Sequence, residues 1–486
     1  MYRTVPALKY LAWLALLSML TAPAYAHSFG KLYTLPVPFW LYGWASAAAL
    51  MLSFLCLAWF ASQPKSASGG YAQPPVFRTF SSVVRPLLIV FQALALTALL
   101  VCIVSGLYGM QDAYRNINMT LFWIVFVLGM AYFTVFAGDV FSLVNPWRTL
   151  TRAFANGRYA YPEKSGCWPA LLLYMGFIWM ELFASVTPWL LSVALLAYTL
   201  LNVLAICFFG AKAWFRYGEF FSVMFRLLGK VAPFAYCQAS PARRAGWRWR
   251  WPFAGLMASR PSSLSEVVFI LFMLSSTAFD GLHNTQAWVL LFWQDGFALL
   301  SPWLGSNIVT AYATLKPLYL VYQTLALLMS PWLYLAVFAC CLWLMKSLTG
   351  SAVPLLELIY RFSYSLLPIV VVYHFTHYFT LVLGQGPQLL TLLSDPLGLG
   401  WNLLATRVDK TSGFLLDMGW VWHIQVASIL LGHIASVYVA HEAARYLYPS
   451  PGAVWLSQIP LLILMMVFTV FGLWILAQPL DAEILR

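Results

Sequence analysis

The chain has 486 residues, of which 62% are hydrophobic and only 9% are charged. A soluble domain of ordinary composition has roughly 25% charged residues, so this composition excludes a soluble globular protein. The formal net charge is +12, and in so apolar a chain it indicates basic cytoplasmic loops rather than nucleic-acid binding. Repeated apolar runs of about 18 residues or more predict transmembrane helices, since the strands of a membrane barrel are much shorter. We therefore predict an all-α fold, a polytopic transmembrane helical bundle.

Residues 1–26 have the pattern of a cleavable signal peptide. Arg3 and Lys9 precede an apolar stretch that is too short to span a membrane comfortably. Ala24-Tyr25-Ala26 then follows the small-x-small rule for signal peptidase. An uncleaved first helix is the alternative interpretation. Cleavage would leave residues 27–486, which we interpret as a single transmembrane domain.

About ten spans are predicted in the mature chain, each from an apolar run of sufficient length. Taken in chain order, they lie near residues 39–61, 86–110, 119–144, 169–186, 188–210, 265–284, 318–345, 362–383, 419–441 and 455–477.

The basic residues predict the orientation of these spans. Most Lys and Arg side chains fall in loops on one side, which the positive-inside rule assigns to the cytoplasm. These are Lys65, Arg78, Arg85, Arg148, Arg152, Arg158, Lys164, Lys346, Arg361, Arg445 and the basic residues of segment 211–264. We expect that segment to be cytoplasmic or interfacial, and segments 285–317 and 384–418 to form periplasmic, re-entrant or lid-like loops. The protein is then a multi-pass protein of a bacterial inner membrane with a periplasmic mature N-terminus.

Five of the seven histidines fall at the outer side in this topology, although they come from separate stretches of sequence. His27 begins the mature chain, and the others lie near the outer ends of spans: His283, His374, His377 and His423. His433 lies near mid-membrane and His441 at the cytoplasmic end. Ionisable residues in a membrane are costly and usually functional, so this gathering predicts a common site.

Spacing along the helices supports that site. His374 and His377 are three residues apart and share one helix face, and Asp280 and His283 have the same spacing. Glu181 adds a carboxylate at a similar depth. Imidazole with carboxylate is a ligand set that Zn²⁺, Mn²⁺, Fe²⁺ or Cu²⁺ accepts, so we predict a divalent transition metal.

Other roles for these residues remain open at this point. Histidines at helix ends also hydrogen-bond carbonyl groups, and two opposed histidines can ligate a haem. The free amine and imidazole of a mature His27 would together resemble a copper histidine brace.

The block from His27 to Tyr42, HSFGKLYTLPVPFWLY, resembles the mature start of membrane-integral fenitrothion hydrolases. These proteins carry signal peptides and hydrolyse organophosphorus insecticides, and they resemble two-component enzymes built from related membrane subunits. The resemblance implies a lipophilic triester substrate that releases a nitrophenol, and a related membrane subunit as partner.

For such a reaction a metal would lower the pKa of a bound water and polarise the phosphoryl group. The expected metal ligands are His27, His283, His374, His377 and His423, with Asp280 as ligand or catalytic base. The alternatives are a copper-binding or redox membrane protein that uses His27, and a transporter of a metal or small solute.

Overall fold

The computed structural model describes the strands and helices of the chain and most of the segments between them. The described residues are 26–28, 31–33, 37–60, 76–78, 81–154, 157–237, 246–304, 307–405 and 417–478. The predicted signal peptide lies outside them, apart from Ala26, and so does the side chain of His27.

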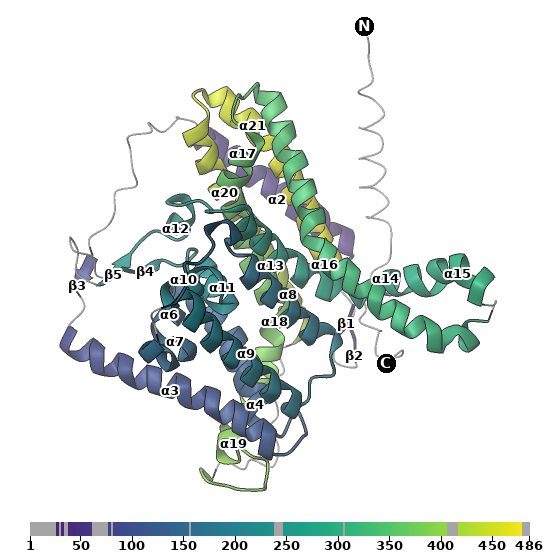
Figure 1. The fold of residues 1–486 in the computed structure, drawn as a ribbon. Helices are drawn as coiled ribbons and strands as arrows, with labels where there is room; N and C mark the ends of the chain where they lie inside the picture. Colours follow the sequence, from purple (N-terminus) through teal and green to yellow (C-terminus); the bar gives the residue numbers. More distant parts are fainter. Residues whose placement is uncertain are drawn as a thin grey trace.

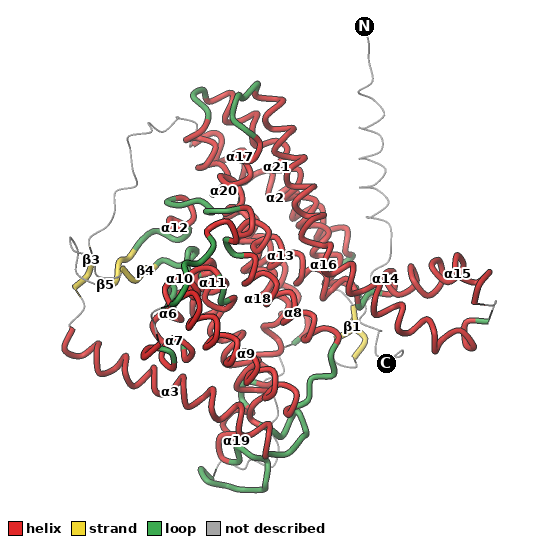
Figure 2. Tube along the Cα trace, viewed as in Figure 1, coloured by secondary structure: helices red, strands yellow, loops and turns green. Residues whose placement is uncertain are grey.

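Ten helical segments of the described chain are long and apolar enough to cross a membrane. They are Phe39–Leu57, Pro86–Tyr108, Ile117–Ala137, Glu163–Phe183, Pro188–Phe209, Leu264–His283, Ile308–Thr349, Leu355–Gln385, Gly419–Leu447 and Pro451–Ala477. Each corresponds to one predicted span, and helices dominate the fold (Figure 2). The prediction of an all-α polytopic bundle is therefore confirmed.

Most spans consist of one long helix. These helices are α2 (Phe39–Phe60), α3 (Ser81–Tyr108), α8 (Trp168–Phe183), α9 (Pro188–Phe209), α13 (Leu264–His283), α16 (Ile308–Thr349), α20 (Met418–Leu447) and α21 (Pro451–Ala477). A short 3₁₀ turn, η3 (Glu163–Ser165), precedes α8.

Two spans are composite. The third consists of α4 (Ile117–Met119), the π-helix η1 (Thr120–Gly129) and α5 (Met130–Ala137), and the eighth of α17 (Leu355–Ser363), η5 (Tyr364–Leu366) and α18 (Leu367–Gln385).

Local sequence fixes where helices begin and end. At the start of α9, the Thr187 side chain accepts a hydrogen bond from the Leu190 amide, and Pro188 occupies the first turn, where its missing N–H costs nothing. The helix ends at Gly210, whose φ of 79° is unfavourable for other residues. Gly350, with φ 62°, ends α16 in the same way.

Helix α13 occupies the centre of the bundle, and nearly all of its side chains are buried. It packs against α8, α16 and α18, which surround it in Figure 1. Peripheral helices instead carry exposed apolar side chains, such as Leu87, Ile89 and Leu100 on α3. These side chains contact lipid, because an apolar surface of this extent is stable in a bilayer and not in water.

The segment between α9 and α13 folds against the bundle. It contains α10 (Ala211–Tyr217), α11 (Phe220–Leu228) and α12 (Ala254–Met257). Strands β4 (Phe234–Cys237) and β5 (Gly246–Trp249) join β3 (Val76–Arg78) in an antiparallel sheet of order β3-β5-β4. Almost every residue of α11 is buried. This helix therefore packs into the protein core and does not lie on a lipid surface, as an interfacial helix would.

Segment 285–317 is largely helical. It contains α14 (Gln286–Leu290), the π-helix η4 (Leu291–Gly296) and α15 (Phe297–Leu304), which project to the side of the bundle with the start of α16 (Figure 1). Helix α16 has 42 residues and a length of about 63 Å, twice the hydrocarbon thickness of a bilayer. Its first turns therefore belong to the projecting hairpin.

The remaining elements are short. They are β1 (Ala26–Ser28), β2 (Lys31–Tyr33), α6 (Phe141–Val144), α7 (Pro146–Leu150), η2 (Arg152–Phe154) and α19 (Gln388–Ser394). Strands β1 and β2 pair antiparallel, with His27 opposite Leu32. Helix α19 lies within the predicted loop 384–418, close to α4 and η1.

Candidate functional site

Polar side chains from three central helices meet near one end of the bundle. Glu181 lies near the end of α8, Asp280 near the end of α13, and His374 and Tyr378 in α18. Helices α8, α13 and α18 belong to the fourth, sixth and eighth spans. Because successive spans run in opposite directions, the ends of these three spans lie on the same face of the bundle as the start of the third span. Alternating topology therefore brings together residues that are far apart in the sequence.

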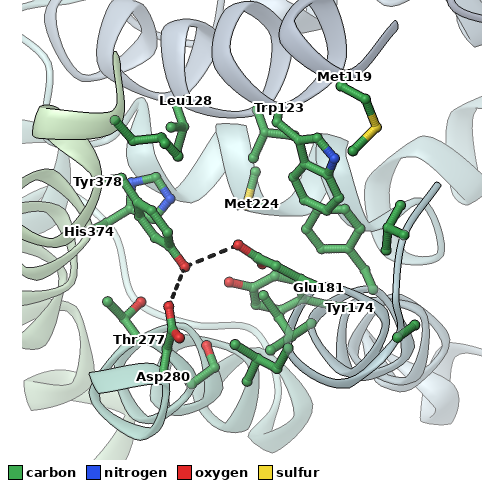
Figure 3. Close-up of a pocket in the computed structure, with 18 residues that line it drawn as sticks. Met119, Trp123, Leu128, Tyr174, Glu181, Met224, Thr277, Asp280, His374 and Tyr378 are labelled. Carbon is green, nitrogen blue, oxygen red and sulfur yellow. Dashed lines mark hydrogen bonds between the residues drawn. The ribbon is translucent and has the colours of Figure 1, made fainter. Parts of the chain in front are cut away.

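These side chains line a cavity of about 260 Å³ (Figure 3). Glu181, Asp280, His374 and Tyr378 form its polar wall. The opposite wall is aromatic and sulfur-containing, as Figure 3 shows, and includes Met119, Trp123, Phe177 and Met224. A cavity with apolar walls and a few converging polar groups is the usual form of a small-molecule site.

Asp280 connects the polar residues of this site. Its Oδ2 atom lies 2.7 Å from Nε2 of His377, and its Oδ1 atom lies 3.6 Å from Nε2 of His283. The Asp280 side chain is 14% exposed and that of His283 only 4%. A buried carboxylate requires partners of this kind, because an unpaired charge in a medium of low dielectric constant is very costly.

Tyr378 joins the two carboxyl groups. Its hydroxyl oxygen lies 2.9 Å from Asp280 Oδ2 and 3.1 Å from Glu181 Oε1 (Figure 3). A phenol has one proton and can donate only one of these hydrogen bonds. The second short oxygen–oxygen distance requires another proton. The simplest arrangement has a protonated Glu181 donating to Tyr378, which donates to the Asp280 carboxylate.

His374 lines the cavity beside this chain of hydrogen bonds. Its ring centroid lies 5.0 Å from that of Tyr378 and 5.9 Å from that of Tyr132. No hydrogen-bond partner for either ring nitrogen occurs among the residues that the structure describes. A neutral imidazole in this position has a lone pair available to accept a proton from a bound molecule.

The π-helix η1 forms part of the apolar wall. Trp123 and Val127 both belong to it, and the Trp123 ring stacks on Phe177 with a centroid distance of 5.3 Å. π-Helical turns are rare and are frequent at functional sites, where the extra residue per turn displaces side chains from α-helical positions. The placement of η1 beside the carboxyl groups is consistent with a binding site.

The predicted site residues divide into three groups. His283 and His377 lie beside Asp280, and His374 lines the cavity. His423 is not brought to this site: its ring is exposed on α20, beside Tyr42. Equal depth along two helices does not make them neighbours, and α20 presents this residue toward α2. The side chain of His27 lies outside the described residues.

The metal centre predicted from the sequence would need at least three ligands close together. No group of three or more His, Cys, Asp or Glu side chains in the described part of the chain is arranged to hold a metal ion. His377 and His283 approach different oxygens of Asp280, which is the pattern of an ion-pair network. The described residues alone therefore do not fit the metal, and the metal centre stays a prediction that would need a ligand outside them, such as His27.

A second buried polar cluster joins Tyr198, in the fifth span, to Glu219, at the start of α11 in the segment between the fifth and sixth spans. Glu219 caps α11 by accepting hydrogen bonds from the amides of Phe221 and Ser222, and the Tyr198 hydroxyl donates to it. Burial raises the pKa of Glu219. Asp139 accepts a hydrogen bond from the Ser142 amide in the first turn of α6, and burial raises the pKa of Asp139 as well. Because these carboxyl groups bond helix N-termini, we assign this cluster a structural role.

Comparison of the chain with protein-family models, curated proteins and solved structures finds no match. The candidate site is therefore defined by its geometry.

Sequence reasoning did not single out Tyr378 as a site residue. The available signal was its spacing, since it follows His374 by four positions and lies on the same face of α18. Tyrosine is common at membrane interfaces, so spacing alone does not distinguish this residue from the other tyrosines of the chain.

Proposed function

We propose that this protein is a membrane-embedded hydrolase of small lipophilic esters, with organophosphorus triesters as the first class to test. The observation that carries the proposal is the hydrogen-bonded chain Glu181–Tyr378–Asp280, which lines, with His374, a cavity whose other walls are mostly apolar. A neutral lipophilic ester would partition into the bilayer and bind against the apolar wall. The polar wall would then face its reactive centre.

The proposed orientation places this cavity near the periplasmic face of an inner membrane. Support comes from the basic residues that follow the odd-numbered spans, at the other ends of the helices from Glu181 and Asp280. Of the basic segments, 211–264 also enters the bundle and contributes Met224 to the cavity wall. A substrate in the outer leaflet would thus reach the site without crossing the membrane. The resemblance of the segment after His27 to fenitrothion hydrolases supports the same class of substrate.

In the proposed reaction, His374 acts as general base. A water oxygen attacks phosphorus while one ring nitrogen of His374 takes its proton. The bond from phosphorus to the aryl oxygen breaks, and the electron pair leaves with that oxygen as a phenolate. A nitrophenolate is a good leaving group and needs no general acid.

Tyr378 and Glu181 would stabilise the charge that develops on the phosphoryl oxygen or sulfur. In the arrangement deduced above both protons are already donated, so the Glu181 O–H would turn from the Tyr378 oxygen to the substrate and the Tyr378 O–H from Asp280, and donors in a site of low dielectric constant stabilise developing charge strongly. The pair of Asp280 and His377 would hold the Tyr378 hydroxyl in place. No step in this mechanism passes through a metal ion.

The test is hydrolysis of a dialkyl nitrophenyl phosphorothioate by the full chain in lipid nanodiscs, measured by the absorbance of nitrophenolate. We expect His374→Gln to lower kcat/KM by at least about 100-fold, the range typical for loss of a general base. His423→Gln is the matched control, because that ring lies away from the cavity, and its rate should change less than about twofold. No hydrolysis by the unmodified protein, or equal effects of the two variants, would overturn the proposal.

A further inference from the structure

The inner end of the main cavity carries a tyrosine that the proposed reaction does not use. Tyr174 belongs to α8 and precedes Glu181 by seven residues, or about two helical turns, so the two residues lie on the same face of the helix. Both line the cavity, and Figure 3 shows the side chain of Tyr174 reaching into it beside Glu181. This face of α8 therefore presents a phenol and a carboxyl group to the same space.

Aromatic neighbours hold the ring of Tyr174 in place. Its centroid lies 5.1 Å from that of Phe269, with the two rings nearly parallel, and 5.1 Å from that of Phe272, with the rings nearly perpendicular. Phe220 stacks on it at 5.8 Å. These arrangements are favourable for aromatic pairs, and the side chain of Tyr174 is only 5% exposed. The position of its hydroxyl oxygen is therefore fixed before a ligand binds.

The hydroxyl group of Tyr174 has no full hydrogen bond within the described part of the chain. Ser276 of α13 is close enough to interact with it, but Ser276 Oγ has no hydrogen-bond partner either. The two hydroxyl groups thus approach each other without reaching the geometry of a hydrogen bond. Ser276 Oγ is closed off from any water-sized molecule, whereas the oxygen of Tyr174 is not among the atoms closed off in this way. Of this pair, the phenol is the group that a ligand can reach.

The O–H groups beside Tyr174 are already committed. In the arrangement deduced above, Glu181 donates to Tyr378, and Tyr378 donates to Asp280. A ligand that accepts a hydrogen bond from either group must first displace an existing one. Tyr174 can donate without such a loss, and leaving its buried hydroxyl without a partner is costly. Phenylalanine would avoid that cost, so the hydroxyl fits a ligand that accepts its proton.

We propose that Tyr174 forms an acceptor subsite, at which its hydroxyl donates a hydrogen bond to the phosphoryl or carbonyl oxygen of a neutral ester. Ser276 donates to the phenol oxygen, and the phenol proton points to the ligand. Sulfur accepts hydrogen bonds only weakly, so the subsite favours a phosphate triester over the corresponding phosphorothioate. Tyr174 is then a specificity-determining residue. Binding at the subsite does not depend on hydrolysis, but its effect on the reaction rests on the proposed function.

The first experiment compares the binding of triethyl phosphate and O,O,O-triethyl phosphorothioate, which differ in one atom and lack a good leaving group. Titration of each probe against the melting temperature of the full chain in nanodiscs gives its Kd, since a ligand of the folded state raises this temperature. We expect Tyr174→Phe to lower the preference for the phosphate about 3- to 10-fold, the effect of losing one hydrogen bond. Partition of the probes into the bilayer is the same for every variant and cancels from this comparison.

Two further variants control the binding experiment. Tyr334→Phe is the matched control, because Tyr334 lies in α16 and does not line the cavity, and its preference should equal that of the native protein. Ser276→Ala should keep the preference within about threefold. A larger rise in Ser276→Ala would mean that Tyr174 donates to Ser276, and would overturn the subsite. An unchanged preference in folded Tyr174→Phe, or no binding of either probe by the native protein, would overturn it as well.

The second experiment measures hydrolysis of diethyl nitrophenyl phosphate and of its phosphorothioate. Tyr174→Phe should lower kcat/KM for the phosphate about 3- to 10-fold more than for the phosphorothioate, because only the phosphoryl oxygen is a strong acceptor. If the native protein hydrolyses neither ester while Tyr174→Phe lowers the binding preference, the proposed function fails and the acceptor subsite stands. If both esters are hydrolysed and Tyr174→Phe changes their kcat/KM values equally, the role of Tyr174 in the reaction is overturned.

Discussion

The phenol oxygen of Tyr378 lies 2.9 Å from Oδ2 of Asp280, although 98 positions separate the two residues in the chain. This contact joins α18 to α13 at the level of the cavity. Interhelical hydrogen bonds in membranes typically contribute only about 0.6–2 kcal/mol, so the contact is not needed to assemble the bundle. Its consequence is chemical, because it couples a carboxylate, a phenol and a second carboxyl group in one cavity wall.

The charge of Asp280 is the first property to test. Asp280→Asn keeps the size of the side chain but removes the negative charge that faces His377 and orders the Tyr378 hydroxyl. We expect kcat for triester hydrolysis to fall about 100- to 1,000-fold, as for other disrupted acid–base networks. Steady-state kinetics in nanodiscs gives this value. Retention of more than a tenth of the activity would contradict a central role for Asp280.

Unlike Asp280, Glu181 should tolerate substitution by the corresponding amide, glutamine. If Glu181 is protonated and donates to Tyr378, glutamine can replace it, since its amide also donates a hydrogen bond. We expect Glu181→Gln to retain at least about a third of the activity and Glu181→Ala to lose about tenfold or more. Equal, large losses in both variants would show instead that an ionised Glu181 is required.

Removal of metal ions distinguishes the acid–base mechanism from the metal centre predicted from the sequence. Since no three described ligands converge, we expect dialysis against a strong chelator to change the hydrolysis rate less than about twofold. Elemental analysis of the dialysed protein confirms that metal is absent. A loss of activity that Zn²⁺, Mn²⁺, Fe²⁺ or Cu²⁺ restores would contradict the acid–base mechanism and point to a centre that includes His27.

Two glycines in spanning helices should have opposite effects on stability. A Cβ atom at Gly106 would lie 2.1 Å from Ser192 Oγ and 2.3 Å from the backbone oxygen of Pro188. Gly106→Ala should therefore separate α3 from α9 and cost about 1–3 kcal/mol. A Cβ atom at Gly176 meets no atom within 4 Å, so Gly176→Ala should stabilise α8 by about 0.5–1 kcal/mol. Thermal unfolding in one detergent measures both, and a loss of stability in Gly176→Ala would contradict this account.

Lys230 should make stability depend on pH. Its Nζ atom bonds to Ser259 Oγ at 2.9 Å, and burial lowers the pKa of Lys230 from 10.5 to about 8, with Glu266 acting against this. Between pH 8 and 10.5, the Lys230 amine is protonated in a larger fraction of unfolded chains than of folded chains. The free energy of unfolding therefore increases as pH rises from 8 toward 10.5. Below pH 8, Lys230 is protonated in both states, so the folded protein bears the full free-energy cost of burying its charge.

The corresponding experiment compares the native protein with Lys230→Met from pH 7.5 to 10. We expect the stability of the native protein relative to the variant to increase over this range by on the order of 1–3 kcal/mol. Lys164→Met, at an exposed position, is the control and should follow the native protein at every pH. Parallel curves for Lys230→Met and the native protein would contradict a lowered pKa.

Part of the candidate site followed from local spacing. The three-residue separation of Asp280 and His283 places both on one face of a helix, and their side chains lie 3.6 Å apart in the fold. His377 and His374 share α18 for the same reason. His423 shows the limit of this reasoning, since it has the expected depth but lies beside Tyr42 on another face of the bundle.

The sequence by itself determined the ten spans and the position of each polar residue along its span. A backbone in lipid must satisfy its own hydrogen bonds, so a sufficiently long apolar run has only the helix available to it. Only the tertiary structure decided which helices are neighbours, and hence that Tyr378 lies between Glu181 and Asp280. Lipid is as apolar as the side chains that face it, so hydrophobicity does not select helix partners, and close packing at positions such as Gly106 contributes to that selection.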